Sequence, residues 1–303
     1  MPSFQFLTAD VFTSARFGGN QLAVFPNAQD LDPALMPCIA REFNFSETTF
    51  VLPPKDPKHT RKVRIFTPGG ELQFAGHPTV GTAFILATIG DVRLTGAETR
   101  IVLEEGVGPV PVTIRAQDGK PGFAQLSVAQ LPQYGPPAPS AADLASALGL
   151  EAGDVLSNDW HAEAVSCGTM FLFVPLRNRA ALARARVRPD DFERVLKGYV
   201  TEKVFLFCDE PELPGSHYRA RMFAPTIGVP EDPATGSACV GFGGYLAKRD
   251  QRADGTLRWV VEQGFEMGRP SILEVEVDKK AGAVAAVRVG GNSVLVTRGE
   301  MIV

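Results

Sequence analysis

Two similar segments of the chain decide the fold that the sequence predicts. The first reads Arg64-Ile65-Phe66-Thr67-Pro68 and, after eight residues, His77-Pro78-Thr79-Val80-Gly81-Thr82-Ala83. The second reads Arg221-Met222-Phe223-Ala224-Pro225 and, after six residues, Asp232-Pro233-Ala234-Thr235-Gly236-Ser237-Ala238. In each, an apolar strand pattern leads to a turn, and a proline stands where the first residue of a helix is expected. The sequence therefore predicts two similar halves.

Both predicted helices lack a polar face. Small, apolar and aromatic residues fill 84–87 in the first half and 240–246 in the second. A helix of this kind is buried on all sides. The strand and helix patterns around it alternate irregularly, which disfavours a doubly wound parallel sheet. We therefore expect an α+β fold of two pseudo-symmetric halves, each a mixed or antiparallel sheet rolled around a central helix.

The length of 303 residues exceeds what one hydrophobic core usually accommodates. A strong turn signal at 118–122 and a proline-dense loop at 132–139 are both possible boundaries. The repeat favours the earlier one. We expect residues 1–118 to form the first half, joined by a C-terminal strand at 291–303, and residues 119–290 to form the second.

The composition bears on location and partners. Apolar residues make up 45% of the chain and the net charge is −4, so there is no basic footprint for nucleic acid. No apolar run is long enough to span a membrane, and no secretory signal is visible at the N-terminus. The four cysteines are widely spaced, which suits reduced thiols. We expect a cytoplasmic protein with neither a nucleic-acid nor a membrane partner.

His77 and Asp232 precede the proline in the two copies and are candidates for proton transfer. Asp232 has a structural alternative, because Asp is a preferred helix N-cap. A metal-binding role for the pair is a weaker alternative, since no ligand cluster surrounds either residue.

Glu47 is a third candidate, because it lies in an otherwise uncharged strand pattern on the same side as Phe45 and Thr49. An inward-facing carboxylate suits a general acid/base, whereas a solvent-facing one would be structural. The turns Thr79-Val80-Gly81 and Thr235-Gly236-Ser237 stand at helix starts. Their backbone N–H groups could bind a carboxylate, or they could merely pack helix against sheet.

Four motifs, in order along the chain, are similar to those of one known family. They are Gly19-Asn20-Gln21-Leu22-Ala23-Val24, Asn44-Phe45-Ser46-Glu47-Thr48, Phe74-Ala75-Gly76-His77-Pro78-Thr79-Val80-Gly81 and Asp232-Pro233-Ala234-Thr235-Gly236-Ser237-Ala238. They resemble the phenazine-biosynthesis PhzF-like family. The resemblance implies a diaminopimelate epimerase-like fold, a site in a cleft between the halves, and a homodimer.

The resemblance also implies roles for individual residues. Glu47 matches the catalytic glutamate, which in PhzF moves a proton between ring carbons of trans-2,3-dihydro-3-hydroxyanthranilate, and His77 and Asp232 match its polar partners. The positions that match the substrate pocket are Asn20, Gln73, Gly76, Thr235, Gly236 and Ser237. Gln21 and Gln73 stand where family members commonly have proline, so the substrate does not follow from the resemblance. No cysteine stands in either turn, which disfavours a two-thiol racemase.

We therefore expect a cofactor-free isomerase that acts on a small cyclic or amino-acid-like carboxylate. No nucleotide, flavin or metal motif is present in the sequence. Two alternatives remain open: a metal-dependent hydrolase using His77 and Asp232, and a non-catalytic small-molecule-binding protein on the same fold.

Overall fold

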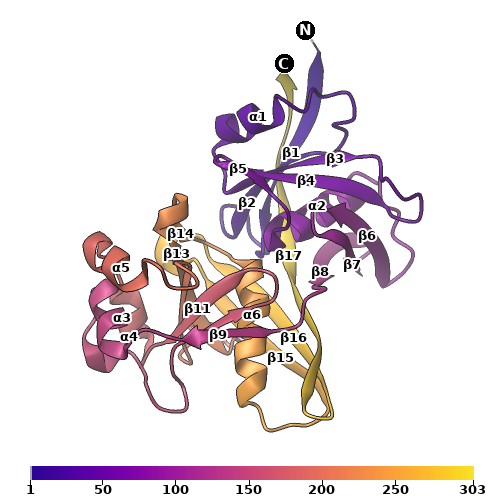
Figure 1. Cartoon of the computed structure of the whole chain (residues 1–303). Coiled ribbons are helices and arrows are strands. Elements are labelled where there is room, and N and C mark those ends of the chain that lie inside the picture. The colour runs from indigo at the N-terminus through magenta and orange to yellow at the C-terminus, as the bar shows by residue number, and fades with distance from the viewer. Residues whose placement is uncertain (1) are drawn as a thin grey trace. The chain divides into compact units, whose positions relative to one another are not determined.

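The computed structural model describes residues 2–303, and its contacts divide the chain into two units. Unit 1 comprises Met1–Ser127 and Val289–Val303, and unit 2 comprises Val128–Arg288 (Figure 1). The first boundary lies later than the 118/119 position suggested by the turn signal. The reason is that β8 (Lys120–Ser127) continues the antiparallel pairing of β7 (Gly108–Gln117) after that turn.

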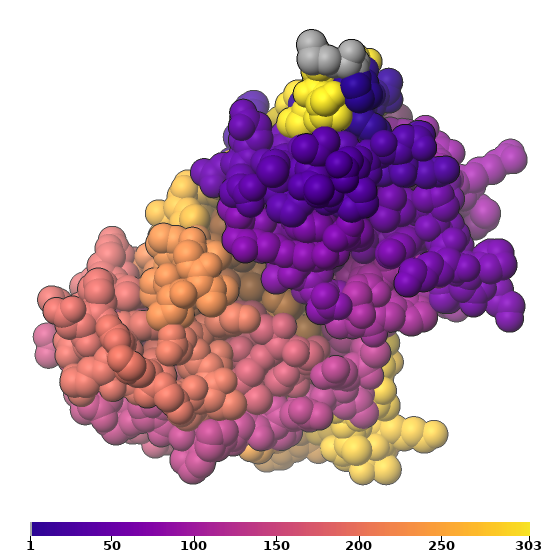
Figure 2. All heavy atoms as spheres, turned by 45° about the horizontal axis from the view of Figure 1, so that its top comes forward, coloured from indigo at the N-terminus to yellow at the C-terminus, as the bar shows by residue number. Residues whose placement is uncertain are grey.

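In unit 1, eight strands close into a ring. Their pairing order is β17-β1-β2-β3-β4-β6-β7-β8, and β8 pairs back to β17. The bounds are β1 (Ser3–Val11), β2 (Asn20–Phe25), β3 (Glu47–Leu52), β4 (Arg61–Thr67), β6 (Glu98–Glu105) and β17 (Ala283–Ile302), with β5 (Gly70–Leu72) added as a hairpin to β4. Figure 2 shows the first and last segments of the chain side by side, as the antiparallel β1–β17 pairing requires.

The helix α2 (Gly76–Thr88) packs against β1, β2, β3, β7 and β8, and every residue from Gly76 to Ala87 is buried. The expectation of a helix buried on all sides is confirmed for this unit. The helix α1 (Met36–Phe43) packs against β3 and β4, over a cluster of phenylalanines that includes Phe25 and Phe50.

In unit 2, the strands pair in the order β9-β10-β11-β12-β13-β15-β16. Their bounds are β9 (Gln133–Pro137), β10 (Glu163–Ser166), β11 (Met170–Pro175), β12 (Val204–Cys208), β13 (Tyr218–Ala224), β15 (Gly255–Gln263) and β16 (Ser271–Lys280), with β14 (Val229–Asp232) paired to β13. The helix α6 (Gly236–Arg249) packs on β10, β11, β15 and β16. The helices α3 (Ala141–Ala147), α4 (Arg179–Arg184) and α5 (Pro189–Leu196) contribute residues to a second apolar cluster. Three short 3-10 turns complete the unit at Ala152–Asp154, Pro225–Ile227 and Phe265–Met267.

The two units repeat one topology. In unit 1, β2 and β3 are parallel, β3 and β4 antiparallel, and β4 and β6 parallel. In unit 2, β11 and β12, β12 and β13, and β13 and β15 follow the same sequence of directions. In both, a strand hairpin leads into the central helix (Figure 1). The expected α+β fold of two similar halves is confirmed.

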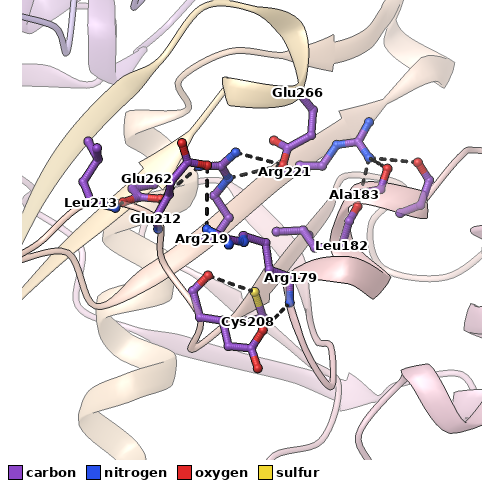
Figure 3. A network of polar contacts seen from close by, with 12 residues as sticks. Arg179, Leu182, Ala183, Cys208, Glu212, Leu213, Arg219, Arg221, Glu262 and Glu266 are labelled. Carbon is purple, nitrogen blue, oxygen red and sulfur yellow. Dashed lines mark hydrogen bonds and ion pairs between the residues drawn. The ribbon is translucent and has the colours of Figure 1, made fainter.

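Polar contacts repeat as well. Glu104, at the end of β6, accepts hydrogen bonds from the backbone N–H groups of Lys55 and Asp56, both at 2.8 Å. At the equivalent place on β15, Glu262 accepts from the N–H groups of Glu212 at 2.9 Å and Leu213 at 2.6 Å. Glu262 also pairs with the buried Arg219 at 3.0 Å, and Figure 3 shows Arg219 reaching Glu266 as well.

The structure corrects where the central helices begin. We expected a proline at the first helical position. Instead α2 begins at Gly76, two residues before Pro78, and α6 begins at Gly236, after Pro233. No helix among residues 2–303 is long and apolar enough to cross a lipid bilayer.

Candidate active site

Glu47 is the first residue of β3, and its side chain faces the start of α2. The side chain is 15% exposed, and its Oε2 lies 3.3 Å from Nε2 of His77. The parallel pairing of β2 with β3 sets Glu47 beside Leu22, so its position is fixed by the sheet. Of the two orientations considered from the sequence, the structure has the inward-facing one.

His77 is the second residue of α2 and is buried, with 4% of its surface exposed. Its Nε2 lies 3.3 Å from the backbone oxygen of Gln21 as well as 3.3 Å from Glu47. A backbone carbonyl and a carboxylate both accept hydrogen bonds, so Nε2 carries the ring proton. Burial lowers the pKa of His77 to about 3, opposed by the hydrogen bond to Gln21. At neutral pH His77 is therefore an uncharged hydrogen-bond donor.

The close approach of α2 to β2 depends on a glycine. A Cβ atom added at Gly81 would lie 2.6 Å from the side chains of both Leu22 and Val11. Such a contact is far inside van der Waals distance, so a side chain there would push the helix away. With glycine present, the first turn of α2 lies against β2 and brings His77 to the carbonyl of Gln21.

The remaining site residues predicted for unit 1 surround this turn. Gly76 is buried and begins the helix, after Ala75, which has no side-chain oxygen to cap the first-turn N–H groups. Asn20 is buried at the start of β2. Gln73 is exposed, and its carbonyl accepts a hydrogen bond from the N–H of Val107 at 3.1 Å.

In unit 2, Asp232 ends β14 and is buried. Its Oδ2 accepts a hydrogen bond from Oγ1 of Thr235 at 2.5 Å. Thr235 is the N-cap residue of α6, so Asp232 is not the helix cap that the sequence allowed as its structural alternative. Gly236 and Ser237 are the first two residues of the helix, and their N–H groups belong to the turn that can bind an anion.

Gln263, at the end of β15, holds this turn in place through three hydrogen bonds. Its Oε1 accepts from the N–H of Thr235 at 3.0 Å, and its Nε2 donates to the backbone oxygen of Asp232 at 2.7 Å and to Oγ1 of Thr235 at 2.9 Å. In unit 1, Glu105 at the end of β6 contacts the hydroxyl of Thr79, the fourth residue of α2. Our sequence analysis missed both residues. The signal was present, because Glu104-Glu105 and Glu262-Gln263 end corresponding strands of the repeat.

The structure thus brings Glu47 and His77 together within unit 1. Within unit 2 it separately brings together Asp232, Thr235, Gly236 and Ser237. Among residues 2–303, no group of three or more His, Cys, Asp or Glu side chains is arranged to hold a metal ion. Cys239 lies in the first turn of α6, and burial raises the pKa of its thiol. It is therefore un-ionised at neutral pH and poorly suited to act as a base.

The chain is similar to known proteins over its whole length. The family model for PhzC-PhzF, phenazine biosynthesis-like protein, matches residues 9–299. A trans-2,3-dihydro-3-hydroxyanthranilate isomerase of Pseudomonas aeruginosa is 36% identical, with 98% of each chain covered.

Solved structures agree with this assignment. The crystal structure of a Bacillus anthracis phenazine biosynthesis protein of the PhzF family has a TM-score of 0.90 at 28% identity, with 100% of both chains covered. A hydroxyproline epimerase of Agrobacterium vitis is 14% identical and has a TM-score of 0.63, covering 98% of this chain and 92% of its own. The second likeness concerns the fold alone and confirms its epimerase-like character. The chain therefore belongs to the PhzC-PhzF family of phenazine biosynthesis-like proteins, and it is an isomerase.

Proposed function

We propose that the protein is a cofactor-independent isomerase that moves a proton between two carbons of a small cyclic or amino-acid-like carboxylate, with Glu47 as the acid/base. The observation that carries the proposal is the 3.3 Å approach of Glu47 Oε2 to Nε2 of a buried, uncharged His77, whose N–H is directed to the backbone oxygen of Gln21. A carboxylate beside an uncharged imidazole keeps the basicity that a cationic partner would remove.

In the first step, the Glu47 carboxylate takes a proton from an activated carbon. The C–H bond breaks, its electron pair is delocalised into the substrate, and Glu47 becomes a neutral carboxylic acid. In the second step, Glu47 returns the proton to another carbon and becomes a carboxylate again. The uncharged His77 ring packs beside the carboxylate oxygen in both steps and restricts its position.

In unit 2, we assign carboxylate binding to the turn Thr235-Gly236-Ser237. The first-turn N–H groups of α6 carry partial positive charge, and Gly236 lets an anion approach the backbone. Gln263 and Asp232 hold the turn in place through Thr235.

Relatives suggest the first compound to test. The Pseudomonas aeruginosa relative is named for trans-2,3-dihydro-3-hydroxyanthranilate, which is a small cyclic carboxylate. We propose substrates of this class. The homodimer implied by the family resemblance stays a prediction, which light scattering of the purified protein would test.

The proposal is tested by following deuterium incorporation by NMR. The protein is incubated in D₂O with dihydro-hydroxyanthranilate and a panel of small carboxylates. Wild type is compared with Glu47→Gln and with Glu42→Gln, which changes an exposed glutamate on α1. We expect deuterium at a substrate carbon with wild type and Glu42→Gln, and none with Glu47→Gln. Exchange that persists in Glu47→Gln would assign the base to another residue.

A further inference from the structure

Glu105 is a buried acidic residue with no part in the mechanism above. It ends β6 and is 8% exposed, and its Oε1 lies 2.6 Å from Oγ1 of Thr79 in the first turn of α2. Its other oxygen, Oε2, is buried without a hydrogen-bond partner among residues 2–303. An ionised carboxylate in this position would be poorly solvated.

The hydrogen bonds of Thr79 fix the protonation of Glu105. Oγ1 of Thr79 lies 2.7 Å from the backbone oxygen of Ala75 and 2.6 Å from Glu105. A hydroxyl has one hydrogen to donate, and a backbone oxygen can only accept. Thr79 can therefore serve only one of these two acceptors. Both short contacts are hydrogen bonds together only when Thr79 donates to Ala75 and Glu105 donates its own proton to Thr79.

The electrostatic surroundings agree with this assignment. Burial raises the pKa of Glu105 to about 8. The ionisable side chains on the adjoining strands, loop and helix interact with other groups. Arg61 pairs with Asp91, Arg64 with Glu71, Arg115 with Glu98, His59 with Glu104 and His77 with Glu47, and Lys62 acts on Glu71. None of them compensates a charge on Glu105.

We propose that Glu105 is a positioning residue that stays protonated at neutral pH and, through Thr79, holds the turn Ala75–Thr79 that carries Gly76 and His77. Loss of its proton reverses the hydrogen bond to Thr79, leaves the Ala75 carbonyl with only the long 3.4 Å hydrogen bond from the Thr79 N–H, and loosens this turn. The inference rests on the proposed function only in treating His77 as part of the catalytic pair.

Unit 2 provides an internal comparison. Gln263 occupies the position of Glu105, and its Nε2 donates to Oγ1 of Thr235, the threonine at the start of α6. An amide donates whatever the pH. In both units, the last residue of a strand next to the central helix is therefore an uncharged hydrogen-bond donor. Only the donor of unit 1, Glu105, can lose its proton.

The test uses Glu105→Gln, which keeps a donor and removes the ionisation, and two readouts that need no turnover. The first is the infrared difference spectrum between wild type and Glu105→Gln, in which we expect a protonated carboxyl band at about pH 6 that is lost by about pH 9.5. The second is amide hydrogen-exchange protection of residues 75–79, read at Ala75, Gly76, His77 and Thr79 because Pro78 has no N–H, and corrected for the intrinsic effect of pH. We expect it to fall at least about tenfold over this range in wild type and to stay constant in Glu105→Gln.

Two further variants keep the proposal falsifiable if Glu105→Gln does not fold. Gln263→Glu should give the start of α6 the pH dependence that wild type shows only at α2. Thr79→Val should lower the protection of residues 75–79 at both pH values. An absent carboxyl band, or equal protection profiles in wild type and Glu105→Gln, would overturn the proposal. Because neither readout uses a substrate, a positive result together with no deuterium incorporation would reject the proposed function and leave the role of Glu105 standing.

Discussion

The turns before α2 and α6 share one construction but differ in their chemical groups. Each follows a strand hairpin and has a nearby threonine whose hydroxyl contacts the last residue of a neighbouring strand, although Thr79 lies inside α2 and Thr235 is the N-cap of α6. In unit 1 the groups are His77 and Glu105, whereas in unit 2 they are Asp232 and Gln263. The first pair is uncharged through burial, and its members have pKa values of about 3 and about 8.

The difference indicates a division of roles. In unit 1, Glu47 lies beside a neutral donor, which suits proton transfer. In unit 2, Gln263 and Asp232 hold Thr235 at a helix start whose first-turn N–H groups have no side-chain cap, which suits anion binding. Under the proposed function, one backbone plan supports two kinds of chemistry, according to the side chains at a few positions.

The largest expected effect is on enzyme kinetics, where variants in the two units should change different constants. Glu47→Gln should lower kcat about 10²- to 10⁴-fold, because it removes the acid/base. Ser237→Ala, in the turn of unit 2, should mainly raise KM, by about tenfold, because it weakens carboxylate binding. Steady-state kinetics on a substrate found by deuterium incorporation measures both. A Ser237→Ala variant with unchanged KM and lower kcat would contradict the division.

The next prediction concerns the stability that Glu262 and Glu104 contribute, since each accepts hydrogen bonds from the backbone of a loop. Glu262→Gln should destabilise the protein by about 3 kcal/mol, since it leaves the buried Arg219 with Glu266 as its main partner. Glu104→Gln should cost less, because its partner His59 is half-buried and is not a fixed charge. Urea unfolding at neutral pH checks the order. Equal losses would mean that the backbone hydrogen bonds, and not the ion pair, carry the cost.

A third prediction concerns the pH dependence of stability. The folded pKa of Glu105, about 8, lies above its ordinary value of 4.5. Its contribution is therefore complete below about pH 4.5 and is lost as the pH rises to about 8. Glu105→Gln should remove this loss, which is at most about 5 kcal/mol and about half that after local relaxation. Urea unfolding of both proteins from about pH 5 to about pH 9 should show the difference in their stabilities growing up to about pH 8 and then levelling.

His77 should act in the opposite direction in the same experiment. Its folded pKa of about 3 lies below the ordinary value of 6.5. The stability it contributes is present above about pH 6.5 and is lost as the pH falls towards 3. A His77→Gln variant should therefore lose less stability than wild type on acidification. If both proteins lost the same stability on acidification, His77 would not be buried as a neutral ring.

The smallest effect compares packing of the two central helices. Gly81→Ala should destabilise by about 1–3 kcal/mol, because its Cβ would lie 2.6 Å from Leu22 and Val11. Gly241→Ala in α6 should be nearly neutral, since its closest contact would be 3.0 Å to the ring edge of Phe173 and alanine favours helix. Thermal unfolding of the two variants measures their stabilities. A larger loss of stability in Gly241→Ala than in Gly81→Ala would contradict the prediction.

Much of the fold was predictable from local patterns. The central helices were evident from residues 84–87 and 240–246, and the strands that precede them from Arg64 to Pro68 and Arg221 to Pro225. The short helices α4 and α5 were missed, although Asn178 caps the first and Pro189 with two acidic residues begins the second. Segments of six to eight residues carry too little periodicity to be distinguished from loops.

The sequence by itself determined the repeat, the buried central helices, the family and the residue types at the two turns. These depend on local periodicity and on motifs that are contiguous along the chain. Only the tertiary structure decided that Glu47 faces His77, that the ring proton is on Nε2, and that Glu105 and Gln263 lie below the two helix starts. Those facts depend on strand register and helix packing between residues far apart in sequence. Burial by those same contacts then sets the charge of His77 and Glu105, which no local pattern specifies.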